Sequence, residues 1–168
     1  MGYTPPYEIT DEIVCLISSV SEKVGSLSDY KGWINKPHLR RVNRIRSVYS
    51  SLRIEANPLS LREVSDVING KTVIGPMKEI MEVKNAYEAY EQMDTVNPYS
   101  LEDVKQIHGI LTKGIVKESG EFRKGEEGVF RGEQCIFMAP PANLVPSLME
   151  DLFVWMDSVK DTVHPLIL

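Results

Sequence analysis

Acid–base, nucleophilic and metal chemistry have few candidate residues in this sequence. The histidines are His38, His108 and His164, and the cysteines are Cys15 and Cys135. No Cys-x-x-Cys pair and no Cys/His cluster occurs, so the sequence predicts no structural metal site. Both cysteines stand among apolar residues, which predicts small buried side chains rather than a disulfide or a thiolate nucleophile.

The other charged candidates also favour ordinary structural roles. His108 lies beside the apolar stripe of an expected helix, where a lone histidine is usually packed or solvent-facing rather than a ligand. Residues 40–46 form a basic cluster with helical spacing, which predicts a solvated helix face. The net charge of −5 argues against a general nucleic-acid binder, which usually carries a basic stripe.

The composition is that of a globular protein. The chain has 168 residues, of which 42% are hydrophobic and 26% are charged, and this length fits one ordinary domain. The first residues lack the charged start and apolar core of a signal peptide. No apolar stretch approaches the roughly 20 residues that a membrane span needs. We therefore expect a cytoplasmic protein with no membrane association.

Apolar residues at steps of three and four predict amphipathic helices along most of the chain. The first opens near Asp11, and residues 25–37 are turn-prone. The second must end by Asn57, because Pro58 disfavours helical geometry in the residue before it. The residues expected on the apolar faces of these two helices are Ile13, Leu16, Ile17, Val20 and Val24, then Leu39, Val42, Ile45, Tyr49 and Leu52.

The middle of the chain carries clear helix boundaries. Ser60 and Glu63 match a capping box that opens a short helix, and the Asn69-Gly70 pair closes it. Further helices are expected over residues 76–93, from Ser100 onward, and over residues 145–156. The sequence therefore predicts a mainly α fold.

One β-hairpin interrupts the helices. Residues 128–130 and 135–138 are two β-capable runs that flank a short glycine-containing turn, which is typical of a hairpin. The last residues, 164–168 (HPLIL), are similar to the first turn of another helix, since proline is favoured there. They end in three apolar side chains, so we expect an element that is cut short. A tail packed on the core is the alternative.

Several separated segments form a recognisable series of motifs, beginning with residues 50–61 (SSLRIEANPLSL) and continuing through 67–71 (VINGK), 75–76 (GP) and 82–86 (EVKNA). In this order they resemble the Fic family, and residues 50–61 are similar to the inhibitory helix that some members carry before the catalytic domain. Residues 114–123 (GIVKESGEFR) and 128–142 (GVFRGEQCIFMAPPA) resemble the approach to the family's flap hairpin and the flap itself. The resemblance covers about residues 48–168, and it implies a Fic-like helical bundle, incomplete here, with one hairpin flap.

The resemblance implies a protein adenylyltransferase chemistry. Fic proteins transfer AMP from ATP to a Ser, Thr or Tyr hydroxyl through a loop with the pattern His-x-Phe-x-Asp/Glu-Gly-Asn-Gly-Arg. The histidine is the general base, the acidic residue holds Mg²⁺, and the glycine amides cradle phosphates. None of the three histidines is followed two places on by phenylalanine, and no Gly-Asn-Gly occurs. We therefore expect no catalytic residue, no metal ligand and no AMP transfer by this chain alone; ATP and Mg²⁺ are implied only for the complete family domain.

The resemblance also assigns an inhibitory role to the end of the second helix. Ser51 and Glu55 match the family's inhibitory signature, in which the glutamate pairs with an arginine of the catalytic loop and displaces the ATP γ-phosphate. The family has Gly or Asn directly after this glutamate, whereas this chain has Ala56 followed by Asn57, which we include in the inhibitory, nucleotide-facing site. Without the resemblance, Glu55 is an ordinary exposed residue at a helix end.

By the same resemblance, the hairpin clamps an extended segment of the target protein by adding it as a strand. The expected contact residues are Val129, Phe130, Ile136, Phe137 and Met138. An ordinary surface turn with anchoring apolar residues is the alternative.

The expected organisation is an N-terminal helical region, residues 1–57, followed by the first part of a Fic domain, residues 58–168. Three functions remain open at this point: an incomplete Fic AMP-transferase, an antitoxin-like module that inhibits a Fic domain in trans, and a helical interaction domain without activity. The partners implied are a hydroxyl-bearing protein substrate and a Fic-domain partner or missing C-terminal segment.

Overall fold

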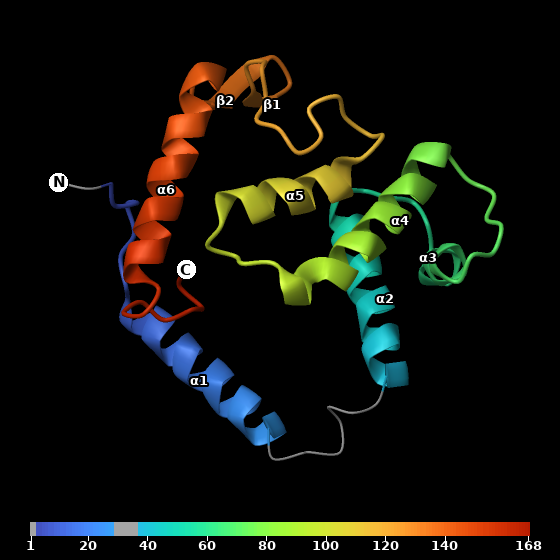
Figure 1. The fold of residues 1–168 in the computed structure, drawn as a ribbon, viewed down its shortest axis with the longest axis horizontal. Coiled ribbons are helices and arrows are strands. Elements are labelled where there is room, and N and C mark those ends of the chain that lie inside the picture. Colours follow the sequence, from blue (N-terminus) through green and yellow to red (C-terminus); the bar gives the residue numbers. More distant parts are fainter. Residues whose placement is uncertain (1–2, 29–36) are drawn as a thin grey trace.

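The computed structural model describes residues 3–28 and 37–168. Within these residues the chain forms six α-helices and one two-stranded antiparallel hairpin, so the predicted mainly α fold is confirmed (Figure 1). None of these helices is long and apolar enough to span a membrane. The elements in chain order are α1 (Asp11–Ser28), α2 (Pro37–Ile54), α3 (Leu61–Ile68), α4 (Met77–Gln92), η1 (Met93–Thr95), α5 (Leu101–Thr112), β1 (Gly128–Arg131), β2 (Gln134–Met138), η2 (Ala142–Leu144) and α6 (Val145–Val159).

The core lies where α2, α3 and α4 pack against one another, with α5 packed on α4 (Figure 1). Val48, Val64 and Val83, one from each of the three core helices, are its fully buried centre. The buried amide of Asn85 joins α4 to α5, since its Nδ2 donates to the carbonyls of Leu111 at 3.1 Å and Lys113 at 2.9 Å. These bonds satisfy carbonyls at the end of α5 that have no partner within the helix.

The predicted capping box of α3 is confirmed in both directions. The Glu63 amide donates to Ser60 Oγ at 3.3 Å, and the Ser60 amide donates to Glu63 Oε2 at 2.8 Å. The Ser60 hydroxyl also donates to that carboxylate, and these two bonds hold the pKa of Glu63 below its usual value. Gly70, at φ 74°, ends the helix region in a left-handed conformation, as predicted.

Helix α1 lies outside this core (Figure 1). It starts where predicted but continues to Ser28 through part of the turn-prone region; residues 29–36 of that region fall outside the described residues. Its apolar stripe is exposed, with Leu16 at 58% and Val24 at 57%. The predicted burial of the two cysteines is wrong: Cys15 is exposed on α1, and Cys135 is exposed on the hairpin. Apolar neighbours in sequence did not imply burial, because these two elements do not pack into the core.

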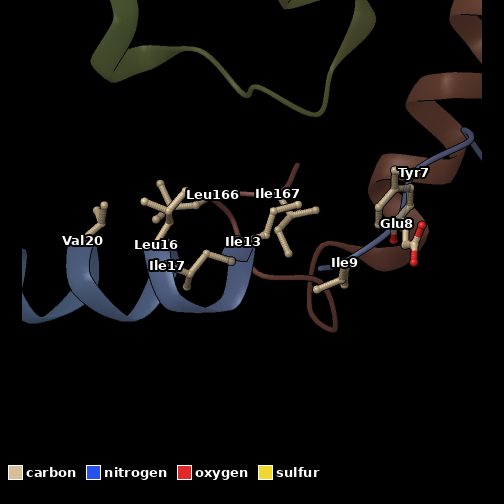
Figure 2. A pocket seen from close by; sticks show the side chains of 9 residues that line it. All are labelled: Tyr7, Glu8, Ile9, Ile13, Leu16, Ile17, Val20, Leu166 and Ile167. Atoms are coloured by element: carbon tan, nitrogen blue, oxygen red, sulfur yellow. The ribbon is translucent and has the colours of Figure 1, made fainter. Parts of the chain in front are cut away.

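The exposed stripe of α1 borders a groove of about 460 Å³ together with the end of the chain (Figure 2). Leu166 lies beside Leu16, and Ile167 lies beside Ile13. Residues 164–168 form a hydrogen-bonded turn, in which the His164 carbonyl accepts from the Ile167 amide at 2.8 Å and from the Leu168 amide at 3.4 Å. The segment that precedes α1 contacts α6 through an edge-on contact between Tyr7 and Trp155, whose ring centroids are 5.7 Å apart.

We expect this chain to self-associate through the apolar face of α1. Contiguous exposed apolar surface of this kind favours association in water. Light scattering after size exclusion should give a mass above the 19.0 kDa of one chain, and Val20→Glu should lower it. Ser19→Glu adds the same charge at an exposed polar position and should leave the mass unchanged. A mass of 19.0 kDa at every concentration for the unsubstituted chain would contradict this expectation.

Candidate functional site

The site that the sequence singles out is built on the C-terminal end of α2. The Asn57 amide donates to the Leu52 carbonyl at 3.0 Å, and the Ala56 amide donates to the Arg53 carbonyl at 3.2 Å. Together with the positive φ of Ala56, 61°, these bonds form a Schellman motif, which satisfies two carbonyls at the helix end. The helix therefore stops before Asn57, as Pro58 predicted, and Ala56 itself supplies the left-handed residue that ends it.

Asn57 anchors this helix end to α4. Its side chain is 3% exposed, and its Nδ2 donates to Glu82 Oε2 at 2.9 Å and to the Glu79 carbonyl at 3.2 Å. Its Oδ1 accepts a bond from the Leu59 amide at 3.1 Å. The buried amide thus fixes the turn that follows α2, and its contacts are to the protein interior. The sequence analysis grouped Asn57 with the nucleotide-facing residues. In the structure its side chain is buried and anchors the end of α2 to α4.

Ser51, in the last turn of α2, and Glu55, directly after the helix, line the same groove, which has a volume of about 480 Å³. The groove is bounded by α2, α4 and α5, and its walls are mostly apolar. The Ser51 and Tyr90 hydroxyls are hydrogen-bonded at 3.2 Å across it. Glu55 is exposed, and within residues 3–28 and 37–168 no ion pair to its carboxylate is found. Its charge is therefore open to a cation brought by another segment.

Replacing Ala56 with glycine is expected to stabilise the chain by about 0.5–1 kcal/mol, because a Cβ disfavours the left-handed conformation that this turn requires. Chemical denaturation would measure the change. Ala142→Gly, in the short η2 helix, is the comparison and should not stabilise. If Ala56→Gly is neutral or destabilising, the strain assigned to this turn is absent.

The five predicted target-binding residues all lie on the hairpin, which projects beside the start of α6 (Figure 1). Each is between 53% and 58% exposed. Val129 pairs with Phe137 and Phe130 pairs with Cys135, so Ile136 is the extra residue of a bulge in β2. A Cβ at Gly128 would lie 3.0 Å from the Phe130 ring of the same strand and 3.2 Å from the Phe137 carbonyl oxygen of β2, so a larger residue there would be crowded.

Two positioning residues were missed by the sequence reasoning. Arg123 donates to the carbonyls of Gly125 and Pro140, which precede and follow the hairpin, and so ties its two arms together. Tyr90 holds the Ser51 hydroxyl, as described above. Arg123 falls inside a segment that resembled the flap approach, but nothing in its spacing indicated which carbonyls it would reach.

The described residues show no group of three or more His, Cys, Asp or Glu side chains close enough to hold a metal ion. His108 makes a structural contact, since its Nδ1 accepts the Gly120 amide at 3.1 Å.

One of three comparisons with known proteins finds a match. No protein-family model matches the chain, and no curated protein matches it. A solved structure does match: a Fic family protein from Desulfovibrio desulfuricans G20, with a TM-score of 0.88 and 44% sequence identity. The match covers 98% of this chain and 50% of that chain, so the present chain spans about half the length of its structural relative. At this identity over nearly its whole length, the chain belongs to the Fic family.

Proposed function

We propose that this chain supplies the inhibitory helix and the target-binding hairpin of a Fic-type protein adenylyltransferase, an enzyme that transfers AMP from ATP to a Ser, Thr or Tyr hydroxyl. The observation that carries the proposal is the Glu55 carboxylate, exposed at the end of α2 and lining a groove together with Ser51. The catalytic loop of such an enzyme is not among these 168 residues.

The proposed inhibition works by charge mimicry. A carboxylate binds an arginine in a bidentate manner, as a phosphate does, so Glu55 would occupy an arginine that otherwise holds the ATP γ-phosphate. This role needs a carboxylate whose position is fixed. The Schellman turn at Ala56 and the buried amide of Asn57 support it, because they attach the end of α2 to α4 directly beside Glu55.

The proposed target binding uses the open edges of the hairpin. A two-stranded sheet leaves unpaired amides and carbonyls on its outer edges, to which an extended segment can add as a further strand. The exposed apolar side chains of Val129 and Phe137 offer contacts for alternate residues of that segment. The Arg123 tether supports this role by holding the hairpin arms together before a target binds.

Incorporation of labelled AMP tests the proposal. The purified chain with ATP and Mg²⁺ should incorporate none, and a fusion to the segment that follows the matched region of the solved relative should do so. Addition of the unfused chain to a separate active Fic protein tests the second candidate, inhibition in trans, which the accessibility of the groove beside Glu55 favours. Incorporation by the purified chain alone would contradict the proposal, and so would a fusion that folds normally but stays inactive after Glu55→Gly removes the inhibitory carboxylate.

A further inference from the structure

A second groove, of about 640 Å³, is lined by residues of α2, α3 and α4 and lies at the N-terminal half of α2. Three arginines line it, Arg40, Arg41 and Arg44, with Glu91 as the carboxylate among its lining residues. This groove is separate from the site above: roughly fourteen residues of helix, about 20 Å, lie between Arg41 and Glu55. The solvated face that the sequence predicted here is present, since Arg40 and Arg41 are exposed, and the structure shows in addition that these arginines line a concave surface.

Arg41 is fixed in this groove by neutral partners. Its Nη2 donates to Asn69 Oδ1 at 2.8 Å, its Nη1 lies 3.5 Å from the Tyr87 hydroxyl, and its guanidinium carbon lies 6.0 Å from the centre of the Tyr87 ring. No ion pair to Arg41 is found among the described residues. The guanidinium is therefore oriented while its charge is not neutralised by a neighbouring carboxylate.

The orientation of Asn69 is itself fixed. Its Nδ2 donates to the Ser65 carbonyl at 2.7 Å and to Ser65 Oγ at 3.2 Å, so its oxygen is turned toward Arg41. Because Ser65 Oγ accepts this bond, the Ser65 hydroxyl hydrogen is available to a ligand, and Ser65 also lines the groove. Arg44, three residues after Arg41 and on the same helix face, forms an ion pair with Glu91.

We propose that this groove binds a phosphate monoester through its dianionic phosphoryl group. A carboxylate satisfies one arginine fork, whereas a phosphoryl group presents three acceptor oxygens and can bond Arg41, Arg44 and the Ser65 hydroxyl together. The volume of the groove exceeds that of the phosphoryl group alone and leaves space for the esterified organic group. Arg41 needs little ordering on binding, because Asn69 and Tyr87 already hold it.

The test uses the complete 168-residue chain and amide NMR shifts, at constant ionic strength set with sodium chloride. The probes are inorganic phosphate, phenyl phosphate and sulfate. We expect saturable shifts at α2 and α3 residues around the groove with millimolar phosphate, tighter binding of phenyl phosphate, and weaker binding of sulfate. Equal binding of inorganic phosphate and phenyl phosphate would show that the organic group is not recognised and would overturn the monoester assignment.

Substitutions separate this site from general charge attraction. Arg41→Ala should weaken phosphate binding about tenfold or more, the usual size of a lost charge-assisted hydrogen bond. Arg62→Ala is the matched control, because it removes the same charge from α3 at a side chain that is 93% exposed and outside the groove. Ser65→Ala should weaken binding several-fold without altering charge. Equal effects of Arg41→Ala and Arg62→Ala on phosphate binding, or shifts that do not saturate, would overturn the proposal. If Arg41→Ala lowers the melting temperature, Arg41→Lys and Ser65→Ala are compared with Arg62→Ala in its place.

Discussion

Replacing Asn57 with leucine is expected to lower the free energy of unfolding by about 3 kcal/mol. The substitution leaves polar groups without hydrogen-bond partners both in the turn after α2 and on α4. The Leu59 amide would lose its acceptor, and Glu82 Oε2 and the Glu79 carbonyl would lose their donor. For a chain of this length each kcal/mol shifts the melting temperature by roughly 2–4 °C. Thermal and urea denaturation should therefore both show a large loss.

Two further variants make the Asn57 result specific. Asn43→Leu is the matched control: it makes the same substitution on α2 at an exposed position, and it should change the stability by about 0.5 kcal/mol or less. Asn57→Asp keeps the shape but places a carboxylate against Glu82, so it should also be strongly destabilising. If the leucine variants at positions 43 and 57 have equal stability, Asn57 is not the anchor of the helix end.

Replacing Glu55 with glycine is expected to raise the rate of AMP incorporation about tenfold or more in the fusion described above. The physical reason is the loss of a bidentate carboxylate–arginine pair, since a charge-assisted pair contributes about 1.5–3 kcal/mol. The groove residue Glu55 lies after the last helical residue of α2, so its replacement should leave the helix intact. Incorporation of labelled AMP at fixed ATP concentration measures the change, and circular dichroism checks the fold. An unchanged rate in a folded variant would mean that Glu55 does not inhibit.

Much of the fold was predictable because its local signals are strong. The capping box at Ser60, the stop before Pro58 and the glycine-containing turn of the hairpin each require particular residues in consecutive positions. Such signals depend on a few neighbouring residues and do not depend on the rest of the fold. The helices and the hairpin therefore appear where the sequence placed them.

The failures concern packing between distant segments. The stripe of α1 has a helical period, but periodicity predicts which side chains share a face and not what covers that face. Cys15 and Leu16 are accordingly exposed. The basic cluster is solvent-exposed as predicted, but the bonds that orient Arg41 were not predicted, because they join it to Asn69 and Tyr87, 28 and 46 positions away.

The candidate site was predictable in part. Ser51 and Glu55 were identified through the resemblance to the family's inhibitory signature, and the structure brings them to one groove. The anchoring contacts of Asn57 run to residues 22 and 25 positions along the chain, and Tyr90 reaches Ser51 across 39 positions. Only the packing of α2 on α4 creates these contacts, so no local pattern in the sequence could indicate them.

The negative charge at position 55 is best isolated by a substitution that keeps the side-chain size. In the fusion, Glu55→Gln removes the charge alone, and Glu22→Gln removes one from the exposed surface of α1. The quantity to measure is the ratio of the two AMP-incorporation rates at saturating ATP. A ratio well above one, by about tenfold, is the predicted result. A ratio of one, with both proteins folded, would contradict the assignment of Glu55 as the inhibitory carboxylate.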